Sequence, residues 1–149
     1  MEVDEHGIVF FFPNLECTVT GHQDNVTKVA FINDGAQVIS ASCDRSVRCW
    51  VIASGRQVRQ LAGEGFNLVE GLSDQRKRGR HVLTRIGHTL RIYDVAKERQ
   101  HLEDGAVEAP VAFFAAPQQI VAVRCHGAEI CVMCDGGAVC FLSAPFLTA

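Results

Sequence analysis

Three residues of the types that form a nucleophilic catalytic triad occur in the first third of the chain: His22, Ser40 and Asp44. A hydrolase of this kind needs an exposed, strained nucleophile and an oxyanion hole. Ser40 instead lies in the middle of the apolar run 38–42, without the glycines of a nucleophile elbow. We therefore expect a structural role for these residues and do not expect an enzyme.

The seven cysteines are odd in number and are not spaced like the framework of a small secreted domain. Cys131 and Cys134 have the spacing of two zinc ligands on a turn, but on a strand residues three apart point to opposite faces. The sequence has no second Cys-x-x-Cys pair and no glycine-rich nucleotide-binding loop. We expect reduced thiols in the protein core, no metal and no cofactor.

Two further features bear on location. The chain begins with the acidic stretch Met1–Glu5, where a signal peptide would be basic. No apolar run approaches the length of about 18 residues that a transmembrane helix needs. Together with reduced thiols, these features predict a protein of the cytoplasm or the nucleus that does not bind membranes.

The one concentration of positive charge comprises Arg76, Lys77, Arg78 and Arg80. A basic loop of this kind can bind phosphate or nucleic acid. The formal net charge is −3, however, and no aromatic residues are interleaved to stack on bases. We favour a solvated loop, and binding of nucleic acid or phosphate through residues 76–80 is the alternative function.

The elements that must position these residues are short strands. Apolar runs of four to seven residues alternate with Gly, Asn, Asp, Ser or Pro, a pattern typical of antiparallel strands. Over residues 21–62 the expected strands are Val26 to Ile32, Val38 to Ser42, Ser46 to Ile52 and Arg56 to Leu61. A four-stranded meander of this kind is typical of a propeller blade.

The chain also repeats itself. Arg48-Cys49-Trp50 aligns with Arg91-Ile92-Tyr93 after a shift of 43 residues, and a further shift of 40 reaches Val132-Met133. Periods of about 40–45 residues are typical of propeller repeats. We therefore predict two degenerate repeats at 63–103 and 106–143. Glu98 to Leu102 would close the first of these, and Pro110 to Ala115 would open the second.

Residues 21–62 resemble a WD40 repeat. The resemblance rests on Gly21-His22, on Asp34-Gly35 and on the run from Ile39 to Trp50, although Trp50 is followed by Val51 where the family has Asp. It implies a hydrogen-bonded network of His22, Ser40, Asp44 and Trp50. The two later repeats lack these residue types at the matching positions, so we expect apolar packing alone to hold them.

The resemblance also implies a non-catalytic scaffold that presents loops to other proteins. In the family arrangement the loop with Gln23 and Asp24 lies beside the turn with Arg45. Arg48 and Arg91 occupy equivalent positions in two repeats, and arginine is favoured at protein interfaces. We expect these five residues to contact partner proteins.

The predicted fold class is all-β, a single domain over 1–149 made of about three WD40-like blades plus one strand. That strand, at 7–12, would be the last strand of an incomplete blade. Propellers typically need four to eight blades to close. The chain is therefore a piece of a larger propeller, a subunit completed by another copy or another protein, or a smaller sandwich of decayed repeats.

Overall fold

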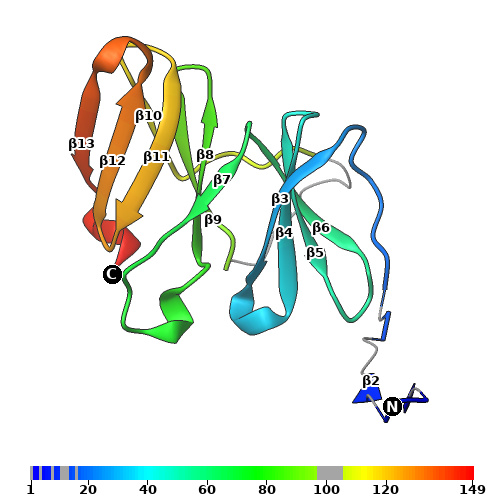
Figure 1. Ribbon diagram of the computed structural model, residues 1–149. Coiled ribbons are helices and arrows are strands. Elements are labelled where there is room, and N and C mark those ends of the chain that lie inside the picture. Colours follow the sequence, from blue (N-terminus) through cyan, green and yellow to red (C-terminus); the bar gives the residue numbers. More distant parts are fainter. Residues whose placement is uncertain (1, 4, 8, 11–13, 16, 97–105) are drawn as a thin grey trace.

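The computed structural model describes residues 2–3, 5–7, 9–10, 14–15, 17–96 and 106–149. Three antiparallel sheets stand side by side in an open arc, with the chain ends at opposite sides of the molecule (Figure 1). Blade 1 contains β3 (Val26–Ile32), β4 (Gln37–Ser42), β5 (Ser46–Val51) and β6 (Gln57–Ala62). Blade 2 contains β7 (Phe66–Leu68), β8 (His81–Ile86), β9 (Thr89–Asp94) and β10 (Ala112–Ala115). Blade 3 contains β11 (Ile120–His126), β12 (Glu129–Cys134) and β13 (Val139–Ser143).

Short 3-10 turns join or follow these strands. They are η1 (Asn33–Gly35), η2 (Gln75–Lys77), η3 (Asp135–Gly137) and η4 (Pro145–Leu147). In η1 the backbone φ is positive at three successive residues, Asn33, Asp34 and Gly35. Asn, Asp and Gly tolerate this left-handed conformation best, which explains why the chain reverses here.

Two apolar cores hold the arc together, and blade 2 contributes a different face to each. Val82 and Tyr93 point toward blade 1, where they join a core with Ile39 and Val47. On the other face, Leu83 and Ile92 belong to the core shared with blade 3. The alternation follows from the period of two in a strand, which sends successive side chains to opposite faces of the sheet.

The fourth strand of blade 2 differs from the prediction. We expected Pro110 to Ala115 to open the third repeat, but β10 pairs with β9 and closes blade 2. Ala112 and Phe114 pack against the core between blades 2 and 3, and this burial fixes the strand on β9. Blade 3 consequently has three strands rather than four. The strand expected at Glu98 to Leu102 lies outside the described residues.

The described N-terminal residues pair with one another. Of the expected strand 7–12, the structure describes β2 (Val9–Phe10), which pairs with β1 (Glu2–Val3) in a separate two-stranded sheet. Gly7, with a φ of 79°, lies in the reversal between them. Its assignment to an incomplete blade stays a prediction, because residues 8, 11 and 12 of the expected strand lie outside the described residues.

Candidate functional site

Four polar side chains meet at the end of blade 1 where β4 turns into β5. The indole Nε1 of Trp50 donates a hydrogen bond to Ser40 Oγ at 2.9 Å. Ser40 Oγ lies 2.6 Å from His22 Nε2, and His22 Nδ1 lies 3.2 Å from Asp44 Oδ2. The structure therefore brings together all four residues that the resemblance implied.

The direction of these hydrogen bonds follows from what each group can donate. An indole N–H is a donor only and a carboxylate is an acceptor only. Ser40 thus accepts from Trp50 and donates to His22 Nε2, while the His22 Nδ1–H donates to Asp44. Every link has one donor and one acceptor, so the chain of bonds rigidifies the strand ends that it joins.

Asp44 collects donors from both sides of this end of the blade. Its Oδ1 accepts from the backbone N–H and the hydroxyl of Ser46, at 2.9 and 2.6 Å. Its Oδ2 accepts from the backbone N–H of Gln23 at 3.0 Å. Burial alone would raise the pKa of the Asp44 carboxyl, but the hydrogen bonds from Ser46, Gln23 and His22 outweigh it and hold that pKa well below its usual range. An ionised carboxylate therefore ties the loop before β3 to the turn before β5.

Sequence reasoning missed two members of this cluster. The Ser46 hydroxyl lies 3.2 Å from His22 Nδ1 and accepts a hydrogen bond from Arg48 Nε at 3.1 Å. Gln57 on β6 accepts from Arg48 Nη1 at 3.0 Å. The only available signal was a serine two residues after an aspartate in a turn, where its backbone N–H commonly bonds the carboxylate. Arg48 is mostly buried in these contacts, and the partner-binding role that we expected for it stays a prediction.

The exposed part of this end carries three of the other predicted residues. Gln23, Asp24 and Arg45 are all exposed, and the Asp44 carboxylate joins their two loops. Arg45 has a φ of 64° and an exposed side chain, whose Nε lies 3.8 Å from Glu64 Oε1. Arg91 does not belong to this group, because it lies on β9 in blade 2, opposite Phe113 of β10.

The basic loop makes contacts within the chain. Lys77 Nζ donates to the carbonyl of Thr148 at 2.6 Å, and Arg78 Nε donates to the carbonyl of Leu72 at 3.2 Å. Arg80 Nε lies 3.3 Å from Asp94 Oδ2. Arg76 is exposed. Three of the four predicted basic residues thus hold the connection between β7 and β8 in place.

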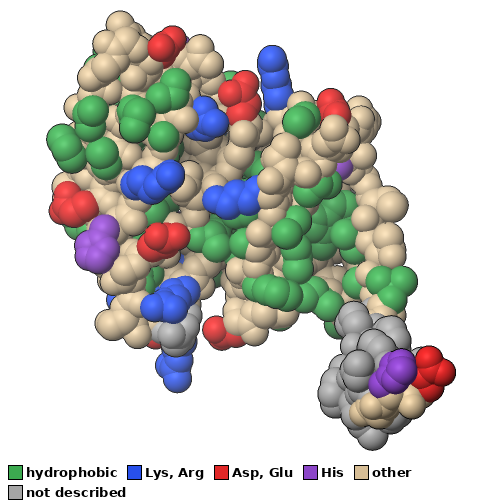
Figure 2. All heavy atoms as spheres, viewed as in Figure 1, with side chains coloured by type: hydrophobic (Ala, Val, Ile, Leu, Met, Phe, Trp, Pro, Cys, Tyr) green, Lys and Arg blue, Asp and Glu red, His purple; other side chains and the backbone are tan. Residues whose placement is uncertain are grey.

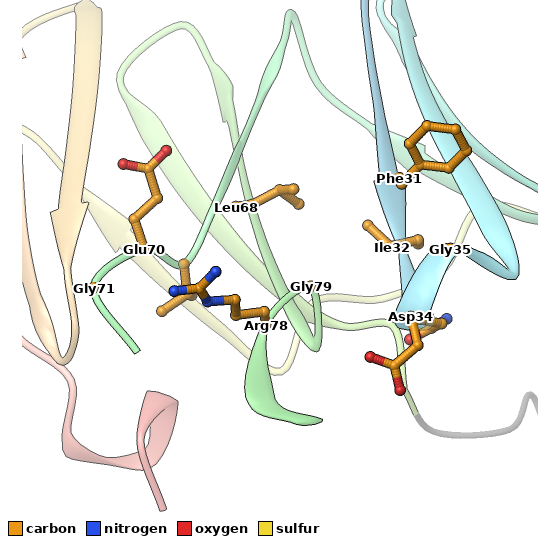
Figure 3. Close-up of a pocket in the computed structure, with 11 residues that line it drawn as sticks. Phe31, Ile32, Asp34, Gly35, Leu68, Glu70, Gly71, Arg78 and Gly79 are labelled. Carbon is orange, nitrogen blue, oxygen red and sulfur yellow. The ribbon is translucent and has the colours of Figure 1, made fainter. Parts of the chain in front are cut away.

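A pocket of about 480 Å³ lies between blades 1 and 2, at the opposite end of β3 from His22. Figure 3 shows Ile32 and Leu68 on its two sides, with Asp34, Glu70 and Arg78 around it. The pocket brings together the η1 turn and the loop after β7, which are far apart in the sequence. None of the sequence patterns that we used indicated it.

The cysteines do not gather into a ligand set. Cys134 is buried in the core between blades 2 and 3, whereas Cys131 lies opposite Phe141 on the other face of blade 3. Burial raises the pKa of the Cys49 thiol to about 12, as expected of a core thiol. Within the described residues, no group of three or more His, Cys, Asp or Glu side chains could hold a metal ion. Among the same residues, no helix is long and apolar enough to span a membrane.

Comparison with known proteins assigns this end of blade 1 to a described repeat. Residues 14–51 match the family model "WD domain, G-beta repeat". An uncharacterized WD repeat-containing protein of Synechocystis sp. (strain ATCC 27184 / PCC 6803 / Kazusa) is 46% identical over 46 residues. That match covers 30% of this chain and 13% of the relative, so the chain spans a small part of the relative's length.

The fold has solved relatives as well. The computationally designed Ika4 protein is similar with a TM-score of 0.52 and 17% identity, over 85% of this chain and 70% of that chain. The designed Ika8 protein is similar with a TM-score of 0.56 and 16% identity, over 84% of this chain and 35% of that chain. These neighbours are designed propeller proteins, and the all-β prediction of partial propeller blades is confirmed.

Proposed function

Because this chain is a WD40-repeat protein, we propose that it is a non-catalytic scaffold that binds other proteins through the loop end of blade 1. WD-repeat domains are generally protein-interaction scaffolds. The observation that carries the proposal is the position of Asp44, which accepts hydrogen bonds from both loops at this end. These loops bear the exposed residues Gln23, Asp24 and Arg45.

The physical support is that this surface is held before a partner arrives. Ordering a loop on binding costs free energy that a loop already held in place does not lose. Here the Gln23 backbone is bonded to Asp44, and the Asp24 carbonyl accepts from the Ser42 hydroxyl at 3.2 Å. A rigid base with exposed polar side chains of both charges suits recognition of a complementary protein surface.

The test is affinity capture with a loop variant. The variant Gln23→Ala, Asp24→Asn, Arg45→Asn removes the recognition groups, and asparagine tolerates the positive φ at position 45. We expect this variant to lose the proteins that the unmodified chain captures, with unchanged Trp50 fluorescence.

The control carries three exposed substitutions in loops at the opposite end of the strands from His22: Asp34→Asn, Glu70→Gln and Arg76→Gln. It should capture the same proteins as the unmodified chain. An unchanged set of captured proteins in the loop variant would overturn the proposal.

Nucleic-acid or phosphate binding through residues 76–80 has weaker support. Lys77, Arg78 and Arg80 donate hydrogen bonds to groups of the chain itself. Retention of the protein on immobilised RNA and on DNA, measured against salt concentration, tests this function. Retention that falls with salt and is lost in Arg76→Gln would favour it over a scaffold role.

We also propose that the protein works in the cytoplasm or the nucleus. The support is that all seven cysteines are free thiols, as reducing compartments keep them. Imaging of the tagged chain in cells tests this placement, and secretion into the medium would contradict it.

A further inference from the structure

The two ends of the arc present sheet faces that have no neighbouring blade. On blade 1 this face contains Val29 and Phe31 of β3, in register with Ser40 and Val38 of β4. On blade 3 the corresponding face contains Met133, Val139 and Phe141. Hydrophobic side chains gather over β3 and β4 at one end of the molecule and over blade 3 at the other (Figure 2).

The two open faces correspond to the two faces that pack together wherever neighbouring blades meet inside the chain. The chain contains two blade-to-blade contacts, between blades 1 and 2 and between blades 2 and 3. In each, the face of the earlier blade that points toward the C-terminal side of the arc packs on the face of the later blade that points toward the N-terminal side. Blade 2 uses both of its faces in this way. The open face of blade 1 corresponds to the face with which blade 2 packs on blade 1. The open face of blade 3 corresponds to the face with which blade 2 packs on blade 3. Blade 3 of one copy can therefore pack on blade 1 of a second copy in the same way.

The side chains on the open faces fit such a contact. Blade 1 has a hollow of about 280 Å³ on its open face, lined by Val26, Val29, Val38 and Trp50 and by the segment before β3. Phe141 on blade 3 is 80% exposed. An aromatic side chain that fills an apolar pocket at the centre of an interface typically contributes most to binding.

Strand order adds an independent observation. Inside the chain, the residues before β7 come from β6 at the outer edge of blade 1, and those before β11 come from β10 at the outer edge of blade 2. By the same rule, the residues before β3 belong at the outer edge of a preceding blade. Among the described residues, blade 3 has no outer strand beside β13, where the other two blades have one.

The segment 14–20 has the sequence pattern of an outer strand that could pair with β13 of a preceding blade. Leu15, Cys17 and Val19 alternate with polar residues, as in a half-buried strand. Its described residues lie outside any strand, and Leu15 is exposed. The segment leads into blade 1, whereas β13 lies at the other end of the arc (Figure 1). Within these 149 residues the segment and β13 therefore stay apart, and a pair between them needs a second copy.

We propose that two copies of this chain close head to tail into a ring of six blades. In this ring, blade 3 of each copy packs its open face on blade 1 of the other, and segment 14–20 pairs with the partner's β13. Two identical contacts related by a two-fold axis close the ring, and six blades lie within the usual range of four to eight. The inference goes beyond the proposed function, since the ring leaves the question of other partners open.

The test is the molar mass of the 149-residue chain in reducing buffer, by size-exclusion chromatography with light scattering at several concentrations. We expect a dimer of twice the 16.3 kDa chain mass. Phe141→Glu on blade 3 and Phe31→Glu on blade 1 should each give a monomer. Val19→Pro should also weaken the dimer, because proline removes a backbone donor from the new strand pair.

The matched control is Phe113→Glu. Phe113 is 73% exposed, close to the 69% of Phe31, but it lies on β10 and on neither open face. The control should remain a dimer. Circular dichroism and Trp50 fluorescence confirm that each variant is folded, and Met133→Glu or Val29→Glu replaces a variant that is not.

Three results would overturn the ring. A folded monomer of the unmodified chain would mean that further blades or another protein cover these faces. A mass that keeps growing with concentration would mean that the contacts do not close. A dimer that survives either Phe141→Glu or Phe31→Glu would mean that like faces pair. None of these results affects protein capture by Gln23, Asp24 and Arg45, which is measured separately.

Discussion

Trp50 and Ser40 lie on neighbouring strands, and the Trp50 indole N–H donates to the Ser40 hydroxyl at 2.9 Å. Trp50 is opposite Val38 in the β4–β5 register, so the bond runs diagonally across the sheet. This diagonal places the serine hydroxyl between the indole and the His22 ring. The pair thus connects the middle of the sheet to the ionised Asp44 at its end.

Replacing Asp44 tests whether this connection stabilises the blade. Asp44→Ala removes the acceptor for Gln23, His22 and Ser46, and leaving the partly buried donors of His22 and Ser46 without this acceptor costs about 1–3 kcal/mol. We expect a loss of unfolding free energy in this range by urea denaturation. A loss below about 0.5 kcal/mol, the range of ordinary surface substitutions, would contradict a structural role for the network.

The Asp44 contribution should also depend on pH. The folded-state pKa of the carboxyl lies below its value of about 3.9 in the unfolded chain. The stabilisation is therefore complete above about pH 4 and is lost as the pH falls toward the folded-state pKa. The difference in unfolding free energy between the unmodified chain and Asp44→Asn should shrink below that pH. A constant difference down to pH 3 would contradict this expectation.

Gly21 and Trp50 should show energetic coupling. A Cβ atom at position 21 would lie 2.9 Å from Trp50 Cη2, closer than real Cβ contacts come. We expect Gly21→Ala to destabilise the protein by about 1–3 kcal/mol through overpacking. In a Trp50→Phe background the smaller ring leaves room, so the same substitution should cost less. A double-mutant cycle measures the coupling, and additive effects would exclude the predicted clash.

Replacing Tyr93 should leave the protein as stable as before or make it more stable, unlike the substitutions above. It is fully buried in the core between blades 1 and 2, and no hydrogen-bond partner is found for its hydroxyl among the described residues. Burying an unpaired hydroxyl costs about 1–3 kcal/mol on mutational scales. Tyr93→Phe keeps the ring and removes the hydroxyl, so thermal unfolding should occur at the same or a higher temperature. A clear fall in the melting temperature would reveal a partner for the hydroxyl.

The ion pair of Arg59 and Glu108 links β6 of blade 1 to the segment that leads into β10 of blade 2. Arg59 is buried, and its guanidinium lies against the Glu108 carboxylate. Arg59→Met removes the guanidinium beside a carboxylate that is only partly exposed, and breaking such a pair typically costs up to about 3–5 kcal/mol. The double variant Arg59→Met, Glu108→Gln should recover much of that loss. A double variant as unstable as the single one would show that the Glu108 charge is not the cause.

The local parts of the fold could be predicted from the sequence, and the distant ones could not. Blade 1 followed from runs of apolar residues separated by tight turns, because each of its strands pairs with the next one along the chain. The strand at β10 was assigned to the wrong blade because a long connection separates it from β9, so spacing no longer identified its partner. Arg59 and Glu108 are 49 residues apart, and no local pattern relates them.

Some residues of the candidate site could be predicted from the sequence and others could not. The roles of His22, Ser40, Asp44 and Trp50 came from the family resemblance, and their contacts match its geometry. The only signal for Ser46 was its position two residues after Asp44, and a serine after a turn is too common to single out. Arg48 looked like an interface residue because of its repeated position, yet its donors bond to Ser46 and Gln57. Burial of a long polar side chain depends on neighbouring strands that the sequence does not reveal.

The middle sheet gives one face to each of the two cores, and this has a consequence for how the molecule unfolds. In a linear array of units, stability comes from each unit and from the contacts between neighbours. Losing either end sheet breaks one such contact, whereas losing the middle sheet breaks both. Amide hydrogen exchange should therefore be slowest in β8 and β9, whose opening requires global unfolding, and faster in the end sheets, which open locally.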